Sequence, residues 1–129
     1  MERVKPVSLL TRIKLSRAFT CYQYLSLLRA VNLSEMPSAS TLLVLFGPLD
    51  LFMDEDVTLA DAQRCWTECR EELHALIHKG TAVLMVSHTP ERFPDARKSW
   101  WKTMEPFVDE RWSVEAGGRD FTRLTLLKN

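Results

Sequence analysis

Two short, continuously apolar segments constrain the fold of this chain more than any other feature. Residues 41–46 (TLLVLF) and 81–86 (TAVLMV) show no alternation of apolar and polar side chains. Such runs are typical of parallel strands that are covered on both faces. The intervening residues 47–80 provide the long crossover that parallel neighbours require. We therefore expect a pair of buried parallel strands joined by a helix.

The crossover contains the clearest helix pattern in the sequence. Thr58 suits the N-cap position, with Asp61 three residues later in an approximate capping box. His78 suits the negative end of the helix dipole, and Gly80 suits the position just after the helix. Steps of three and four residues place an apolar stripe on one helix face, consisting of Ala62, Cys65, Trp66, Cys69, Leu73, Leu76 and Ile77.

Weaker patterns predict the remaining elements. We expect a short strand at Arg12 to Ser16, a helix over 19–31, a helix from Pro94 that carries Trp100, Trp101, Met104 and Phe107, and a hairpin of residues 111–115 and 121–127. In the first helix, Tyr22, Leu25 and Leu28 are spaced to face the core. The expected fold class is α/β, with a mostly parallel sheet, flanking helices and a C-terminal antiparallel hairpin. Residues 1–129 are expected to form a single domain, with residues 1–10 poorly ordered.

Composition excludes several classes of protein. The 17 basic and 17 acidic residues give no net charge, so the whole molecule does not attract nucleic acid or anionic lipid, although a local patch can still form. An odd number of cysteines, three, does not suit a secreted disulfide framework. No apolar run has the length of a secretory signal or of a membrane span. We expect a soluble, cytoplasmic protein that makes no contact with a membrane.

Four potential zinc ligands lie close together in the sequence, but one helix cannot bring them together. At about 100° per residue, Cys65 and Cys69 share one face, whereas His74 and His78 lie on the opposite face. We therefore predict no metal site, with buried cysteines and solvent-facing histidines.

The acidic residues after the first strand leave two interpretations open. Asp50, Asp54, Glu55 and Asp56 follow the strand end, which is where open α/β sheets bind ligands, so these carboxylates could hold a metal-bound nucleotide. The alternative is a solvated loop that places negative charge before the next helix. The chain has no G-x-x-x-x-G-K-[ST] phosphate loop, the main anchor for a nucleoside triphosphate.

Residues 97–102 (RKSWWK) interleave cations and aromatic rings. Such a segment can contact phosphates and stack on unpaired bases. Alternatively, Trp100, Trp101 and Met104 pack inward while Arg97 and Lys98 remain in solvent.

Several segments, in order along the chain, resemble the RecA/recombinase-like ATPase core, which includes KaiC-like proteins. Residues 12–23 (RIKLSRAFTCYQ) look like the second strand of that core and its following helix, with the R-A-F-T turn before a glutamine. Residues 42–56 are similar to the Walker B strand and its acidic continuation, and residues 82–87 to the next core strand. Residues 109–112 (DERW) and 117–119 (GGR) resemble the closing hairpin. The resemblance implies a RecA-like sheet.

The departures from that family concern the triphosphate site. The first strand, phosphate loop and first helix of the family should precede Leu10 and are absent, so the resemblance implies an N-terminally truncated core with an exposed strand edge. The Walker B aspartate that supports magnesium falls on Gly47, which Pro48 follows. The resemblance therefore implies a degenerate Walker B strand and no ATPase activity.

From this resemblance we expect a non-catalytic protein that acts by assembling with partners in DNA recombination or repair and needs no cofactor. The expected partner is a recombinase-like protein or a second copy, together with single-stranded DNA, and the expected DNA contacts are Arg17, Arg97, Lys98, Trp101 and Lys102. An alternative is an ATPase subunit that borrows a phosphate loop from another chain and binds ATP with magnesium through Asp50, Asp54, Ser87 and His88. A third possibility is a degenerate scaffold fragment.

Overall fold

The structure is a computed structural model that describes residues 11–88, 93–97, 99–116 and 122–128. The chain divides into two compact units, with the boundary between Ser87 and His88. In the described residues, no helix has the length and apolar character needed to cross a membrane.

The first unit contains the predicted parallel strand pair. Strand β1 (Leu42–Phe46) pairs with β2 (Ala82–Val86), and Val44 lies opposite Leu84. The connection consists of a short 3-10 helix, η1 (Asp50–Met53), and helix α3 (Leu59–His78). The parallel arrangement predicted from the two apolar runs is confirmed.

Helix α3 begins and ends where its capping residues predict. The N–H of Asp61 donates to Oγ1 of Thr58 at 3.2 Å, so Thr58 is the N-cap. Gly80 has a φ of +88°, the left-handed conformation that glycine adopts without steric cost. Its N–H donates to the carbonyl of Ile77 at 2.9 Å, which satisfies one of the last carbonyls of the helix.

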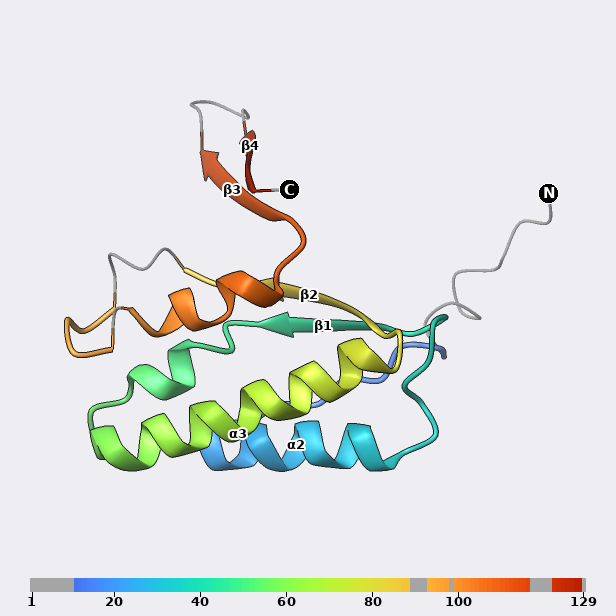
Figure 1. Cartoon of the computed structure of the whole chain (residues 1–129), viewed down its shortest axis with the longest axis horizontal. Coiled ribbons are helices and arrows are strands. Elements are labelled where there is room, and N and C mark those ends of the chain that lie inside the picture. The colour runs from blue at the N-terminus through green and yellow to red at the C-terminus, as the bar shows by residue number, and fades with distance from the viewer. Residues whose placement is uncertain (1–10, 89–92, 98, 117–121, 129) are drawn as a thin grey trace. The chain divides into compact units, whose positions relative to one another are not determined.

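Helix α2 (Cys21–Leu33) packs against α3, and the two lie side by side on one side of the strand pair (Figure 1). The structure shifts the helix by two residues from the predicted range 19–31. The buried positions of α2 are Cys21, Tyr24, Leu25 and Leu28. Tyr22, predicted to face the core, is 48% exposed. The buried face of α2 begins at Cys21 and continues at steps of three and four residues. Tyr22 lies about 100° around the helix axis from Cys21 and is therefore outside that face.

Aromatic packing fills the space between η1 and the two helices. The ring of Phe52 in η1 lies edge-on to Trp66 of α3 at a centroid distance of 5.1 Å, and to Tyr24 of α2 at 6.1 Å. Both Phe52 and Trp66 are fully or almost fully buried. Polar contacts join the far ends of the helices, where the Asn32 amide donates to the Glu72 carbonyl at 2.9 Å.

The strand pair is covered less than the sequence predicts. On β1, Leu45 is buried, but Val44 is exposed and Phe46 is 78% exposed. Leu84 and Val86 of β2 are also exposed. From the continuous apolar runs we expect other elements to cover both faces of the strand pair. That part of the prediction is wrong for this structure, because α2 and α3 lie on one side of the two strands.

The second unit contains the predicted hairpin but not the predicted helix. Strands β3 (Arg111–Ala116) and β4 (Thr122–Lys128) pair antiparallel. Instead of a helix from Pro94, two 3-10 helices form, η3 (Trp100–Thr103) and η4 (Glu105–Phe107). Pro106 lies inside η4 and has no N–H to donate, so it cannot continue an α-helical hydrogen-bond series.

Two further expectations concern the sheet. Arg12 to Ser16 do not form a strand, since the described residues contain two separate two-stranded sheets and no partner pairs with this segment. The α/β class is confirmed, whereas a larger RecA-like parallel sheet is not present in the described part of the chain. The expected poor order of residues 1–10 and the strand residue Phe121 lie outside the described residues.

Candidate functional site

The carboxyl ends of β1 and β2 meet at one edge of the strand pair, as expected for parallel strands in register. The N–H of Gly47 donates to the carbonyl of Val86 at 2.7 Å, which extends the pairing one residue beyond β1. Asp50 and Ser87 therefore follow neighbouring strand ends, and both are exposed. His88, the next residue in the chain, is also exposed and begins the second unit.

Gly47 forms a tight turn at the position where the resemblance expects an aspartate. Its φ is +59°, in the left-handed region that side-chain-bearing residues rarely adopt. A Cβ at this position would lie 2.8 Å from Oδ2 of Asp50. The Asp50 carboxylate thus occupies the space that a side chain at position 47 would need. This turn cannot present an aspartate at residue 47 in the geometry of an extended strand end.

The other acidic residues of this loop have local roles. The Asp54 carboxylate accepts a hydrogen bond from the Asp56 N–H at 3.0 Å, and the Asp54 carbonyl accepts one from Val57 at 3.2 Å. Asp54 therefore stabilises the turn that leads into α3. Asp54, Glu55 and Asp56 are all exposed. This arrangement favours the solvated-loop interpretation for these three residues.

Nowhere in the described residues do three or more His, Cys, Asp or Glu side chains form a group that could hold a metal ion. As the helix geometry predicts, Cys65 and Cys69 are buried while His74 and His78 face solvent. Burial, followed by the neighbouring Cys21, raises the pKa of Cys65 to about 11. Thiols in such an environment are protonated and unreactive at neutral pH.

Cys21 lies in the same buried cluster, which the sequence pattern does not predict. The thiol of Cys65 donates to the Cys21 carbonyl at 3.2 Å, so the contact joins α3 to the first residue of α2. The only signal in the sequence is the apolar spacing from Cys21 to Leu28, which places Cys21 on the inward face of α2.

The expected DNA-contacting residues of the second unit differ in exposure. Arg97 is only 6% exposed, and its guanidinium carbon lies 5.8 Å from the centroid of the Trp100 ring. The expectation that Arg97 remains in solvent is wrong, whereas Trp100 packs inward as the alternative interpretation predicts. Lys102 is exposed on η3. Lys98 and the side chain of Trp101 lie outside the described residues.

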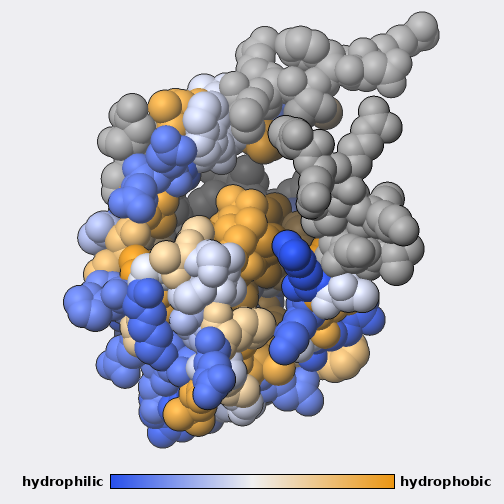
Figure 2. All heavy atoms as spheres, turned by 90° about the vertical axis from the view of Figure 1, so that its right-hand side faces the viewer, coloured by the Kyte–Doolittle hydropathy of each residue, from blue (hydrophilic) through white to orange (hydrophobic). Residues whose placement is uncertain are grey.

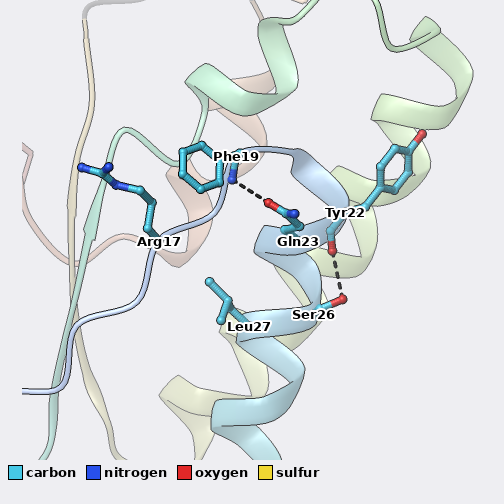
Figure 3. Close-up of a pocket in the computed structure, with 6 residues that line it drawn as sticks. All are labelled: Arg17, Phe19, Tyr22, Gln23, Ser26 and Leu27. Atoms are coloured by element: carbon cyan, nitrogen blue, oxygen red, sulfur yellow. Dashed lines mark hydrogen bonds between the residues drawn. The ribbon is translucent and has the colours of Figure 1, made fainter.

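A shallow pocket of about 450 Å³ lies where the extended segment before α2 meets that helix. We call it the Phe19 pocket; its lining residues are Arg17, Phe19, Tyr22, Gln23, Ser26 and Leu27 (Figure 3). Phe19 is 70% exposed, and the Arg17 guanidinium carbon lies 5.8 Å from its ring centroid. In Figure 3 the side chains of Arg17 and Leu27 lie on the same side of α2 as the Phe19 ring, whereas the Tyr22 ring points away from them.

The start of α2 holds the Phe19 backbone in place. Oγ1 of Thr20, the N-cap residue, accepts a hydrogen bond from the Gln23 N–H at 3.1 Å. The Gln23 side-chain oxygen accepts one from the Phe19 N–H at 2.8 Å. These reciprocal bonds resemble a capping box and attach the residue before the helix to its first turn. Of the predicted DNA-contacting residues, Arg17 is the one that lines this pocket.

The sequence interpretation missed the other five lining residues because it placed Tyr22 in the core. The inward series Cys21, Tyr24, Leu25 and Leu28 leaves Tyr22, Gln23 and Ser26 on the outer part of the helix. The exposed Phe19, two residues before the helix, has no comparable signal in the sequence.

The chain was compared with protein-family models, with curated proteins and with solved structures, and none of the three comparisons finds a match.

Proposed function

We propose that this chain is a non-catalytic, RecA-like protein that acts by assembling with a protein partner in DNA recombination or repair. The observation that carries the proposal is the exposed apolar face of the β1–β2 pair. Its side chains lie opposite one another in register, as the pairs Leu42 and Ala82, Val44 and Leu84, and Phe46 and Val86.

Large apolar side chains gathered on one strand face usually mark an interaction surface. The exposed fractions are 61% for Leu42, 78% for Phe46 and 51% for Leu84. Within the described residues, no further strand pairs with the outer edges of β1 and β2. Unpaired edges are templates for strand addition by another chain. Both features favour assembly. Figure 2 shows that apolar side chains gather on the face of the molecule that it presents.

The role in DNA metabolism is supported by the ordered resemblance to the RecA-like core. The turn at Gly47 supports a non-catalytic role, because the position expected to hold the magnesium-supporting carboxylate has no side chain. The expected partner is a second copy of this chain or a recombinase-like subunit, and the expected compartment is the cytoplasm. We propose no cofactor.

The assembly proposal is tested by the oligomeric state of the purified chain. Light scattering after size exclusion, over a series of protein concentrations, should show self-association, or association with an added recombinase-like subunit. The double variant Phe46→Lys/Leu84→Lys should reduce association at least tenfold in Kd, because each substitution places a charge on the apolar face.

Leu33→Lys is the matched control. Leu33 is 88% exposed and is the last residue of α2, so it belongs to neither strand and its substitution should leave association unchanged. A monomeric wild-type chain that binds no such subunit would contradict the proposal. Equal effects of the double variant and of Leu33→Lys would assign association to general surface hydrophobicity and also contradict it.

The ATPase alternative makes a different prediction. If the chain borrowed a phosphate loop, the assembled protein would bind ATP only with magnesium, and Asp50→Ala would abolish binding. Isothermal titration with magnesium-ATP, performed on the assembled sample, distinguishes the two functions.

A further inference from the structure

We propose that the Phe19 pocket binds single-stranded nucleic acid, with Phe19 as a stacking surface for a base and Arg17 as a phosphate contact. This inference rests on the proposed role in DNA metabolism and gives that role a binding site. It differs from the expected contacts at residues 97–102, of which Arg97 is buried.

Phe19 has the properties of a stacking surface. A phenylalanine ring is usually buried, yet this ring is 70% exposed. Its backbone is attached to α2 by the hydrogen bond to Gln23, so the ring extends from an ordered helix start. Every base has an aromatic face, and stacking on such a ring therefore tolerates any base.

Arg17 places a cation over one face of that ring, with its guanidinium carbon 5.8 Å from the ring centroid. A base can therefore stack on the opposite face of Phe19 while a phosphate of the same strand meets Arg17. Leu27 and the polar groups of Gln23 and Ser26 complete the lining.

The surrounding charge also favours an anionic ligand. Residues 11–34 contain four basic residues, Arg12, Lys14, Arg17 and Arg29, and no acidic residue. The chain as a whole has no net charge, so this segment is a local concentration of positive charge. Arg29 is paired with Glu68 at 3.5 Å, whereas Arg12, Lys14 and Arg17 are exposed next to the pocket in sequence.

The Asp61 carboxylate of α3 acts on Tyr22, one of the residues that line the pocket. Partial desolvation and then the Asp61 carboxylate raise the pKa of Tyr22, so this phenol stays neutral at physiological pH. Asp61 itself forms an ion pair with Arg64 at 2.8 Å, which reduces its repulsion of a phosphate. Tyr22 is 48% exposed, and its ring points away from Phe19 and Arg17 (Figure 3), so it takes no part in the proposed contact.

An apolar peptide would fit this pocket less well. It would cover Phe19 and Leu27 but would also remove water from Arg17 without supplying an opposite charge, which is unfavourable. A nucleic acid strand supplies the aromatic face and the anion together. The observations therefore favour nucleic acid over a peptide.

The test is the fluorescence anisotropy of labelled single-stranded oligonucleotides, one of DNA and one of RNA, titrated with the full chain at several salt concentrations. Phe19→Leu keeps an apolar side chain but removes the ring, and should weaken binding roughly 5- to 50-fold. Arg17→Glu should weaken binding and lower the slope of log affinity against log salt by about 0.7 or more.

Phe107→Leu in the second unit is the matched control for the ring, because it removes a ring that is 41% exposed. Lys102→Glu reverses an exposed charge among the expected contacts at residues 97–102 and therefore tests that alternative site. Both should leave affinity within about twofold of wild type if the Phe19 pocket is the site. Circular dichroism of every variant establishes that it is folded.

Three outcomes would overturn the inference. Loss of binding in Lys102→Glu but not in Arg17→Glu would move the site to the second unit and leave the proposed function intact. Binding that ignores both Phe19→Leu and Arg17→Glu would exclude the pocket. A wild-type chain that binds neither oligonucleotide would exclude direct contact with nucleic acid. The proposed assembly is tested separately by light scattering and does not depend on this result.

Discussion

At the scale of single residues, Gly47 determines what the end of β1 can do. A residue with a side chain at φ +59° is strained whatever the space around it, and the Asp50 carboxylate fills the space where a Cβ would lie. The chain reaches η1 through this turn because glycine adopts it without that cost. Gly47, which stands where the resembling family has an aspartate, is therefore also required by the local backbone conformation.

We predict that Gly47→Ala lowers the free energy of unfolding by about 1–2 kcal/mol, because alanine pays the cost of the left-handed conformation and must displace Asp50. Urea unfolding followed by circular dichroism measures the change. Gly80→Ala is the matched control, since Gly80 is also left-handed (φ +88°) but the nearest atom to its added Cβ is 3.8 Å away.

The double variant Gly47→Ala/Asp50→Ala separates the two contributions. If the contact with Asp50 matters, the double variant should recover part of the loss and approach the effect of Gly80→Ala. An unchanged stability in Gly47→Ala would show that this turn adopts another conformation.

At the scale of elements, α3 is specified by local signals and α2 less so. Unpaired backbone groups at both ends of α3 find hydrogen-bond partners within four positions. The Asp61 N–H donates to Thr58, and the Ile77 carbonyl accepts from Gly80. The range of α2 differs from prediction by two residues because its N-cap, Thr20, lies one residue after the exposed Phe19. Thr20 is a comparable local cap that the predicted start at Phe19 did not use, so capping residues mark the boundaries of these helices more closely than apolar spacing does.

We predict that Thr58→Ala destabilises the chain by about 1 kcal/mol, because the Asp61 N–H loses its acceptor. The urea midpoint of unfolding measures the effect. Thr67→Ala is the control on the same helix: its hydroxyl donates to the Gln63 carbonyl within the helix, and alanine there should be neutral or slightly stabilising. Equal losses in both variants would contradict a specific capping role.

At the scale of the whole molecule, the first unit is held together by contacts between segments far apart in the sequence. Phe52 of η1 packs on Trp66 of α3 and on Tyr24 of α2, and Cys65 contacts Cys21 across 44 positions. The second unit has its own hairpin and short helices. The stability of the first unit should therefore depend on the protonation of its buried thiols.

We predict that the free energy of unfolding falls as the pH rises above about 9. The folded pKa of Cys65, about 11, exceeds its ordinary value of 9.0, so the unfolded chain loses this proton first. The contribution is fully present below pH 9 and is lost towards pH 11, with a slope of at most about 1.4 kcal/mol per pH unit. Urea midpoints at pH 8, 9 and 10 under reducing conditions measure it.

Cys65→Ala isolates this thiol from the tyrosines, lysines and other cysteines that titrate in the same range. The variant should be less stable than wild type at pH 8, with a shallower decline above pH 9. Parallel pH profiles for the two proteins would exclude Cys65 as the source.

The candidate sites were less predictable than the fold. The pairing of the two apolar runs follows from the length of their crossover, and the hairpin follows from the turn-forming residues between its strands. In contrast, the burial of Arg97 and the exposure of Tyr22 depend on which neighbours each side chain meets. Side-chain burial at element ends is set by tertiary packing, which a local pattern does not contain.

By itself, the sequence determined the α/β class, the parallel strand pair, the ends of α3 and the absence of a phosphate-loop motif. Those properties depend on residue type and on spacing along the chain, both of which the sequence contains. Only the tertiary structure decided that one face of the strands is open, that three cysteines share one core and that Arg17 and Phe19 form a pocket with α2. Each of these depends on the positions of separate segments in space, because burial and pockets are made by surfaces that meet only after the chain folds.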